Sequence, residues 1–183
     1  MNARERVMRA WKLKEGTPDR VPVQFDLCES LLEHFSRELD IPSSITKNLY
    51  EDVTWRISGN EVRLALGADV VVTGAAEAAS FKPEISENGT WLNEYGMRMR
   101  QGSIYVEVSE YPLKEVKTIQ DVKDMLVLPD LSLPGRFDDA AALVKKYKDE
   151  YFVIGDIEVT ILTLIQQTVG MEKLMMDMAM GEE

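Results

Sequence analysis

Two short, uninterrupted runs of apolar residues constrain the fold of this 183-residue chain more than any other feature. Residues 70–73 read Val-Val-Val-Thr between Gly67 and Gly74, and residues 151–155 read Tyr-Phe-Val-Ile-Gly. Apolar runs of this length beside glycine are typical of strands buried on both faces, as in parallel sheets. Segments with apolar residues at helical spacing lie between and around the runs, so the sequence predicts parallel β/α winding.

A third parallel strand is predicted at residues 21–25, whose β-branched and aromatic residues favour an extended chain with Pro22 at its start. Helices are expected after Asn2 and over residues 30–41, 45–66, 137–149 and 159–180, with Gly170 interrupting the last. Three parallel strands are too few to close a barrel, which has eight strands and about 250 residues. The pattern therefore indicates either a small open sheet or a severed barrel.

Between residues 81 and 113 the spacing of apolar residues changes from helical to alternating. Asn88 and Gly89 can form a tight hairpin turn, because both tolerate positive φ angles. The sequence thus predicts an antiparallel excursion over residues 81–113 within a single domain of residues 1–183. Thr118 and Asp121 then begin a short helix.

Charge and composition exclude several functional classes. The chain has 32 acidic and 21 basic residues, a net charge of -11, which argues against binding along nucleic acid or an anionic membrane surface. Cys28 is the only cysteine, so no intramolecular disulfide can form. No stretch has the length of a signal-peptide core or a membrane span. These features predict a cytoplasmic enzyme that acts on a small-molecule substrate.

Seven short segments, in their order and spacing, resemble the uroporphyrinogen decarboxylase superfamily. The resemblance implies a (β/α)8 TIM-barrel fold roughly twice this length, so the chain is expected to be an N-terminal partial barrel with the antiparallel β excursion inserted. It also implies an open sheet edge, covered by the missing C-terminal half or by a second copy in a homo-oligomer. The segments are residues 4–7, 19–23, 67–70, 93–96, 111–113 with the helix start at 118–121, 128–130, and 170–174 with Asp177.

Residues 25–30 distinguish between two branches of the superfamily. Porphyrinogen decarboxylases carry the arginine-bearing segment Met-Arg-Gln-Ala-Gly-Arg here, which supplies cations to a polycarboxylate substrate. This chain has Phe-Asp-Leu-Cys-Glu-Ser, with two acids and no arginine, which would repel such a substrate. The resemblance then favours the methyltransferase-like branch, which moves methyl groups between corrinoid proteins and thiols.

No cofactor is expected within this chain. The branch implies a corrinoid and a zinc ion in the full-length protein, the zinc held by His and Cys residues of the C-terminal half, and a corrinoid protein as a partner. Two alternatives stay open: a uroporphyrinogen decarboxylase of porphyrin and haem biosynthesis, and a non-catalytic binding or scaffold half-barrel.

Asp69 is the catalytic candidate, because it corresponds in the resemblance to an active-site aspartate near the second strand. Alternation along the strand predicts that its side chain faces the barrel interior, where polar groups or substrate must satisfy it. The alternative is an aspartate that only ends the preceding helix.

Five further residues are candidate contacts for substrate or cofactor. Asp26, Cys28 and Glu29 follow the first predicted strand, at the end where barrel enzymes build active sites. We favour the alternative that they are a small buried thiol and the acids of a first helical turn. Asp156 and Glu158 follow the third strand and are either contacts or helix-start acids. His34, the only histidine, is expected to be a helical surface residue, and no metal site is predicted.

Overall fold

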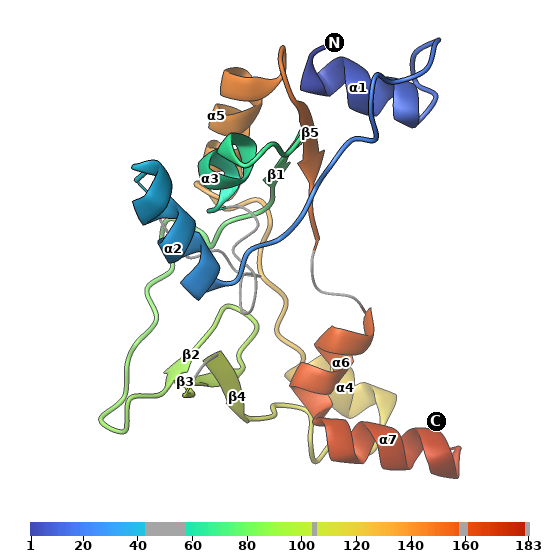
Figure 1. Cartoon of the computed structure of the whole chain (residues 1–183). Helices are drawn as coiled ribbons and strands as arrows, with labels where there is room; N and C mark the ends of the chain where they lie inside the picture. Colours follow the sequence, from blue (N-terminus) through green and yellow to red (C-terminus); the bar gives the residue numbers. More distant parts are fainter. Residues whose placement is uncertain (43–57, 104–105, 158–160, 182–183) are drawn as a thin grey trace. The chain divides into compact units, whose positions relative to one another are not determined.

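The computed structural model describes residues 1–42, 58–103, 106–157 and 161–181. The chain forms two compact units, one of Met1–Ala79 with Pro134–Glu158 and one of Ser80–Leu133 with Val159–Glu183 (Figure 1). The single domain of residues 1–183 stays a prediction. Within the described ranges, every helix is too short or too polar to cross a bilayer.

The first unit is built on a two-stranded parallel sheet. β1 (Val70–Thr73) pairs with β5 (Phe152–Gly155), with Val70 opposite Phe152 and Thr73 opposite Gly155. Both apolar runs are therefore strands, and their parallel pairing is as predicted. The helices of the unit are α1 (Ala3–Ala10), α2 (Glu29–Leu39), α3 (Asn60–Ala65) and α5 (Asp138–Tyr147).

Two apolar clusters hold these elements together. Val7 of α1 packs with Val70 and Val72, and Phe152 and Ile154 of β5 lie against the same cluster. α1 begins where the sequence predicts, because the side chain of Asn2 accepts a hydrogen bond from the N–H of Glu5 at 2.8 Å. The second cluster joins α2 and α3 through Leu27, Leu32 and Val62.

The predicted TIM-barrel fold is wrong. Residues 21–25 form no strand, and Val21 is 80% exposed. This segment is joined to the chain next to β1 by one backbone hydrogen bond, from the N–H of Asp69 to the C=O of Val23 at 2.8 Å. Further along β1, the side-chain amide of Asn60 takes both the N–H and the C=O of Val72, at 2.9 and 2.7 Å. A side chain thus occupies the edge that a neighbouring strand would need, and the described residues contain two parallel strands in place of a barrel wall.

The second unit contains a separate antiparallel sheet, as predicted for residues 81–113. The order is β2 (Trp91–Leu92), β3 (Arg98–Gln101) and β4 (Val106–Glu110). The turn before β2 lies where Asn88 and Gly89 indicate, with Gly89 at φ 77° and the N–H of Ser86 bonded to the C=O of Thr90 at 2.8 Å.

The helices of the second unit are α4 (Ile119–Met125), α6 (Ile161–Val169) and α7 (Met171–Met180). α4 begins with the capping box formed by Thr118 and Asp121. Gly170 separates α6 from α7 at φ 94°, a conformation that other residues rarely adopt, as the predicted interruption requires. The helix predicted over residues 45–66 falls largely on residues 43–57, outside the described residues; its final part is α3.

Candidate functional site

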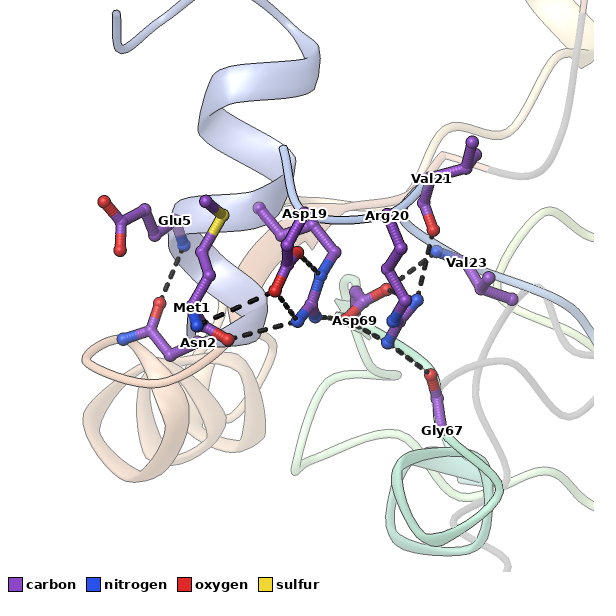
Figure 2. A network of polar contacts seen from close by, with 10 residues as sticks. Met1, Asn2, Glu5, Asp19, Arg20, Val21, Val23, Gly67 and Asp69 are labelled. Atoms are coloured by element: carbon purple, nitrogen blue, oxygen red, sulfur yellow. Dashed lines mark hydrogen bonds and ion pairs between the residues drawn. The ribbon is translucent and has the colours of Figure 1, made fainter. Parts of the chain in front are cut away.

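Asp69 lies directly before β1, at the amino end of the two parallel strands, in the middle of a polar network (Figure 2). Its residue is 1% exposed. Arg6 donates to Oδ1, and Arg20 donates to Oδ2 at 2.7 Å and to Oδ1 at 2.9 Å. The N–H of Val23 donates to Oδ2 at 2.8 Å. Each carboxylate oxygen of Asp69 therefore accepts two hydrogen bonds.

Arg6 is shared between Asp69 and a second carboxylate. Its Nε donates to Asp19 Oδ1 at 2.6 Å and its Nη2 donates to Oδ2 at 3.1 Å. These hydrogen bonds lower the pKa of Asp19 to about 2. The Met1 amine lies 3.7 Å from Asp19 Oδ2, so the network joins the start of α1, residues 19–23 and β1.

The contacts of Asp69 favour a structural role. A carboxylate has about four lone-pair positions, and here protein donors take them all. The sequence predicts a side chain facing a barrel interior, whereas the structure directs it at Arg6 and Arg20. A cavity of about 410 Å³ borders the network, but its charged lining of Arg6, Arg20, Asp69 and Glu150 is balanced in sign. The catalytic role of Asp69 stays a prediction.

Asp156 lies at the opposite, carboxyl end of the sheet. It follows β5, and its N–H donates to the C=O of Thr73, the last residue of β1, at 2.7 Å. With about 3.3 Å per residue, the length of β1 puts Asp156 about 16 Å along the strands from Asp69. These two acids cannot contact the same reacting group. In open parallel sheets ligands bind outside the carboxyl ends of the strands, so Asp156 has the position expected of a substrate contact.

Asp26 is tied to β1 through two buried side chains. Arg63 is 0% exposed, and its Nη1 donates to the C=O of Phe25 at 3.3 Å and lies 4.0 Å from Asp26 Oδ1. Its Nη2 donates to Asn60 Oδ1 at 2.8 Å, and Asn60 bonds in turn to the backbone of Val72. Asp26 is therefore connected to the half of β1 nearer the carboxyl edge.

Cys28 is the N-cap residue of α2. Its Sγ lies 3.4 Å from Ser30 Oγ, and hydrogen bonds from Ser30 and from the N–H of Leu31 lower the pKa of the thiol. Glu29 is the exposed first residue of α2, where the helix dipole favours an acid. His34 is exposed on the same helix, with its ring edge-on to Phe35 at a centroid distance of 5.1 Å.

The described residues do not fit a zinc site. No three His, Cys, Asp or Glu side chains among them converge as metal ligands, whereas zinc takes four ligands, or three and a water molecule. The contacts assign no described residue to a corrinoid either. Glu158 lies outside the described residues.

Sequence reasoning missed the partners that shape both ends of the sheet. Arg6 and Arg20 lie inside segments that carry the family resemblance, and their place in those segments could have marked them as partners of Asp69. Asn60 and Arg63 lie on a predicted helix as ordinary polar residues, and nothing in the pattern indicates that both are buried.

The two units define an α/β protein with a small parallel sheet, an acidic segment near its carboxyl edge and an arginine-bound aspartate at its amino end. A comparison with protein-family models, curated proteins and solved structures finds no match to the chain.

Proposed function

We propose that this chain is part of an enzyme of the uroporphyrinogen decarboxylase superfamily that takes part in methyl transfer involving a corrinoid, and that its substrate contacts lie at the carboxyl edge of β1 and β5. The observation that carries the proposal is the acidic character of the segments at and near this edge. Asp26 and Glu29 stand where porphyrinogen decarboxylases carry arginine, and Asp156 follows β5. Carboxylates would repel a polycarboxylate tetrapyrrole.

Arg63, a buried arginine close to Asp26, does not make this edge attractive to a substrate carboxylate. Arg63 lies 4.0 Å from Asp26, but it is 0% exposed and its guanidinium donates to Phe25 and Asn60. Because the side chain is fully buried, a substrate carboxylate could reach it only if the residues that cover it moved. This geometry supports methyl transfer over decarboxylation.

In this proposal the residues of the chain bind and orient a small substrate. Asp156 is fixed to β1 by its backbone hydrogen bond to Thr73, and Asp26 is connected to β1 through Arg63 and Asn60. The zinc ion and the corrinoid are assigned by the resemblance to the rest of the longer protein, so no step of the chemistry is derived from the residues described.

The test uses the gene product that contains this chain together with any polypeptide that follows it. The protein is incubated with methylcobalamin, zinc and 2-mercaptoethanol, and the methylated thiol is measured by mass spectrometry. A parallel reaction supplies uroporphyrinogen. We expect methylated thiol and no decarboxylated porphyrinogen. Decarboxylation would overturn the proposal in favour of the decarboxylase, and no product in either reaction would overturn it in favour of a non-catalytic protein.

Matched variants locate the substrate contacts. Asp26→Asn combined with Glu29→Gln removes two charges near the proposed edge, and Glu33→Gln combined with Glu38→Gln removes two exposed charges further along α2. We expect the first pair to lower kcat/KM about tenfold or more and the second to change it less than twofold. Equal effects of the two pairs would contradict a substrate site at this edge.

A further inference from the structure

The second unit contains a groove of about 700 Å³ that the proposed function does not use. The segment Lys114–Thr118, the start of α4, the end of α6 and one side of α7 form its walls. Figure 1 shows α4, α6 and α7 gathered in this unit. The volume falls within the range of about 300–1,000 Å³ that is usual for small-molecule sites.

Backbone contacts fix the walls relative to one another. The N–H of Leu113 donates to the C=O of Thr168 at 2.8 Å, which fastens the segment before α4 to the end of α6. The ring of Tyr111 lies against Gly170, 3.3 Å from where a Cβ of that residue would be. Leu113 and Thr168 are each 4% exposed, so this junction is buried. The groove is thus formed by a packed junction and does not need a ligand to assemble it.

The lining combines aliphatic and basic side chains. Val116, Val122 and Val169 are half-buried and supply apolar surface. Lys114 and Lys117 are exposed at the groove, and neither ammonium group has an ion-pair or hydrogen-bond partner among the described residues. Unpaired lysines at a concave surface are notable in a chain with 32 acidic and 21 basic residues.

The other charges of the lining nearly cancel. Lys173 pairs with Asp177 at 2.7 Å, which leaves Glu115 as the remaining carboxylate of the lining. Asp121, just beyond the groove, already accepts the N–H groups of Lys117 and Thr118 at 3.1 and 2.9 Å. The lining therefore carries a surplus of one positive charge, which Asp121 just beyond it offsets, so the attraction for an anion is local to the exposed ammonium groups of Lys114 and Lys117.

We propose that this groove binds a small amphipathic carboxylate, with its head group at Lys114 and Lys117 and its aliphatic chain along Val116, Val122 and Val169. Lysine ammonium groups attract the anion, and their alkyl stems extend the apolar surface. The proposal is independent of methyl transfer, because it concerns the other unit and different residues.

The probe is octanoate, titrated into the full chain while the methyl resonances of the valines are followed by NMR. We expect saturable shifts of Val116, Val122 and Val169, and weaker binding at higher salt, because exposed charges are screened. Lys114→Ala combined with Lys117→Ala should lower the affinity about tenfold. Lys145→Ala combined with Lys148→Ala removes the same charge from exposed sites in the other unit and should change it less than twofold.

Octylammonium serves as the charge-reversed control, and circular dichroism checks that each variant is folded. The proposal is overturned if the three valines do not shift, if the two lysine pairs have equal effects, or if octylammonium binds as tightly as octanoate. Selective loss in the groove variant, together with a preference for the carboxylate, supports it.

Discussion

Asp69→Asn tests the network that anchors β1. Asparagine keeps the volume of the side chain but turns one acceptor oxygen into an NH₂ donor. Whichever way the amide is turned, this donor faces the guanidinium of Arg20 and one further donor, either Arg6 or the N–H of Val23. Both arginines also lose a counter-charge that is 1% exposed. The first unit should therefore become less stable.

The magnitude follows from what each arginine retains. Removing one partner of a buried ion pair costs about 3–5 kcal/mol. Arg6 keeps its two hydrogen bonds to Asp19, and the Arg20 side chain is 45% exposed and can be hydrated. Both features favour the lower end, so we expect a loss of about 3 kcal/mol. At about 2–4 °C per kcal/mol, Tm should fall by about 6–12 °C.

Thermal and urea unfolding followed by circular dichroism measure this loss. Asp40→Asn is the matched control, because Asp40 is exposed and adopts a positive φ that asparagine tolerates, so its effect should stay within about 0.5 kcal/mol. A loss below about 1 kcal/mol in Asp69→Asn would refute the reasoning. If stability were unchanged while turnover of the full protein fell about one hundredfold, the catalytic role would be supported instead.

Two further changes test polar contacts of the first unit. Asn60→Leu should lower the free energy of unfolding in urea by about 2–4 kcal/mol, because the N–H and C=O of Val72 and the guanidinium of Arg63 each lose a hydrogen bond in a buried site. The amide of Val72 should also exchange faster with solvent, and unchanged exchange would contradict this reasoning. Asp19 has its pKa lowered from 3.8 to about 2 by Arg6, so its stabilisation is complete above pH about 4 and is lost as pH falls through about 2. Asp19→Asn should therefore flatten the fall in Tm over this window, and an identical acid profile would count against the Arg6 contact.

Elements that are decided locally could be predicted from the sequence. The runs that became β1 and β5 are apolar except for Thr73, and this composition favours a strand whichever partner it has. β1 is buried at every position as predicted, whereas β5 is half-buried and ends at the exposed Gly155. Asn2 and Thr118 mark helix starts through bonds to residues three positions away, and Gly170 marks a break through its own φ. Each of these sequence signals lies within a few residues of the strand, helix start or helix break that it determines.

The number of strands in the parallel sheet could not be predicted in this way. Residues 21–25 have the composition of a strand, but a strand also needs a free edge to pair with. The side chain of Asn60 takes the backbone groups of Val72, and Pro22 has no N–H to donate. Composition indicates whether a segment can be extended, and it does not indicate what already occupies the edge beside it. The barrel prediction failed at this step.

In the candidate site too, the local features could be predicted from the sequence and the tertiary contacts could not. The sequence indicates that an acid beside an apolar run must be satisfied, which singles out Asp69, but its arginine partners are 63 and 49 residues away. The acids near the carboxyl edge are visible as residues that follow predicted strands. The link from Asp26 to β1 through Arg63 and Asn60 is a tertiary contact with no sequence signature.

The segments that carry the family resemblance meet one another in the structure. In the first unit, Arg6, Asp19, Arg20 and Asp69 come from three such segments and form one network. In the second unit, the segment of residues 111–113 contacts the start of the segment at residues 170–174: Leu113 bonds to the C=O of Thr168, and the ring of Tyr111 lies against Gly170. These segments therefore contribute contacts that hold each unit together. The acids near the carboxyl edge, Asp26, Glu29 and Asp156, lie outside the segments that form these two contacts, although Asp26 is connected to β1 through Arg63 and Asn60. In the proposed function, the preference for methyl transfer over decarboxylation depends on these acids, whose charge the Asp26 and Glu29 variants change. Because Asp26 lies 4.0 Å from the buried Arg63, thermal unfolding of the variant separates a loss of substrate contact from a loss of stability.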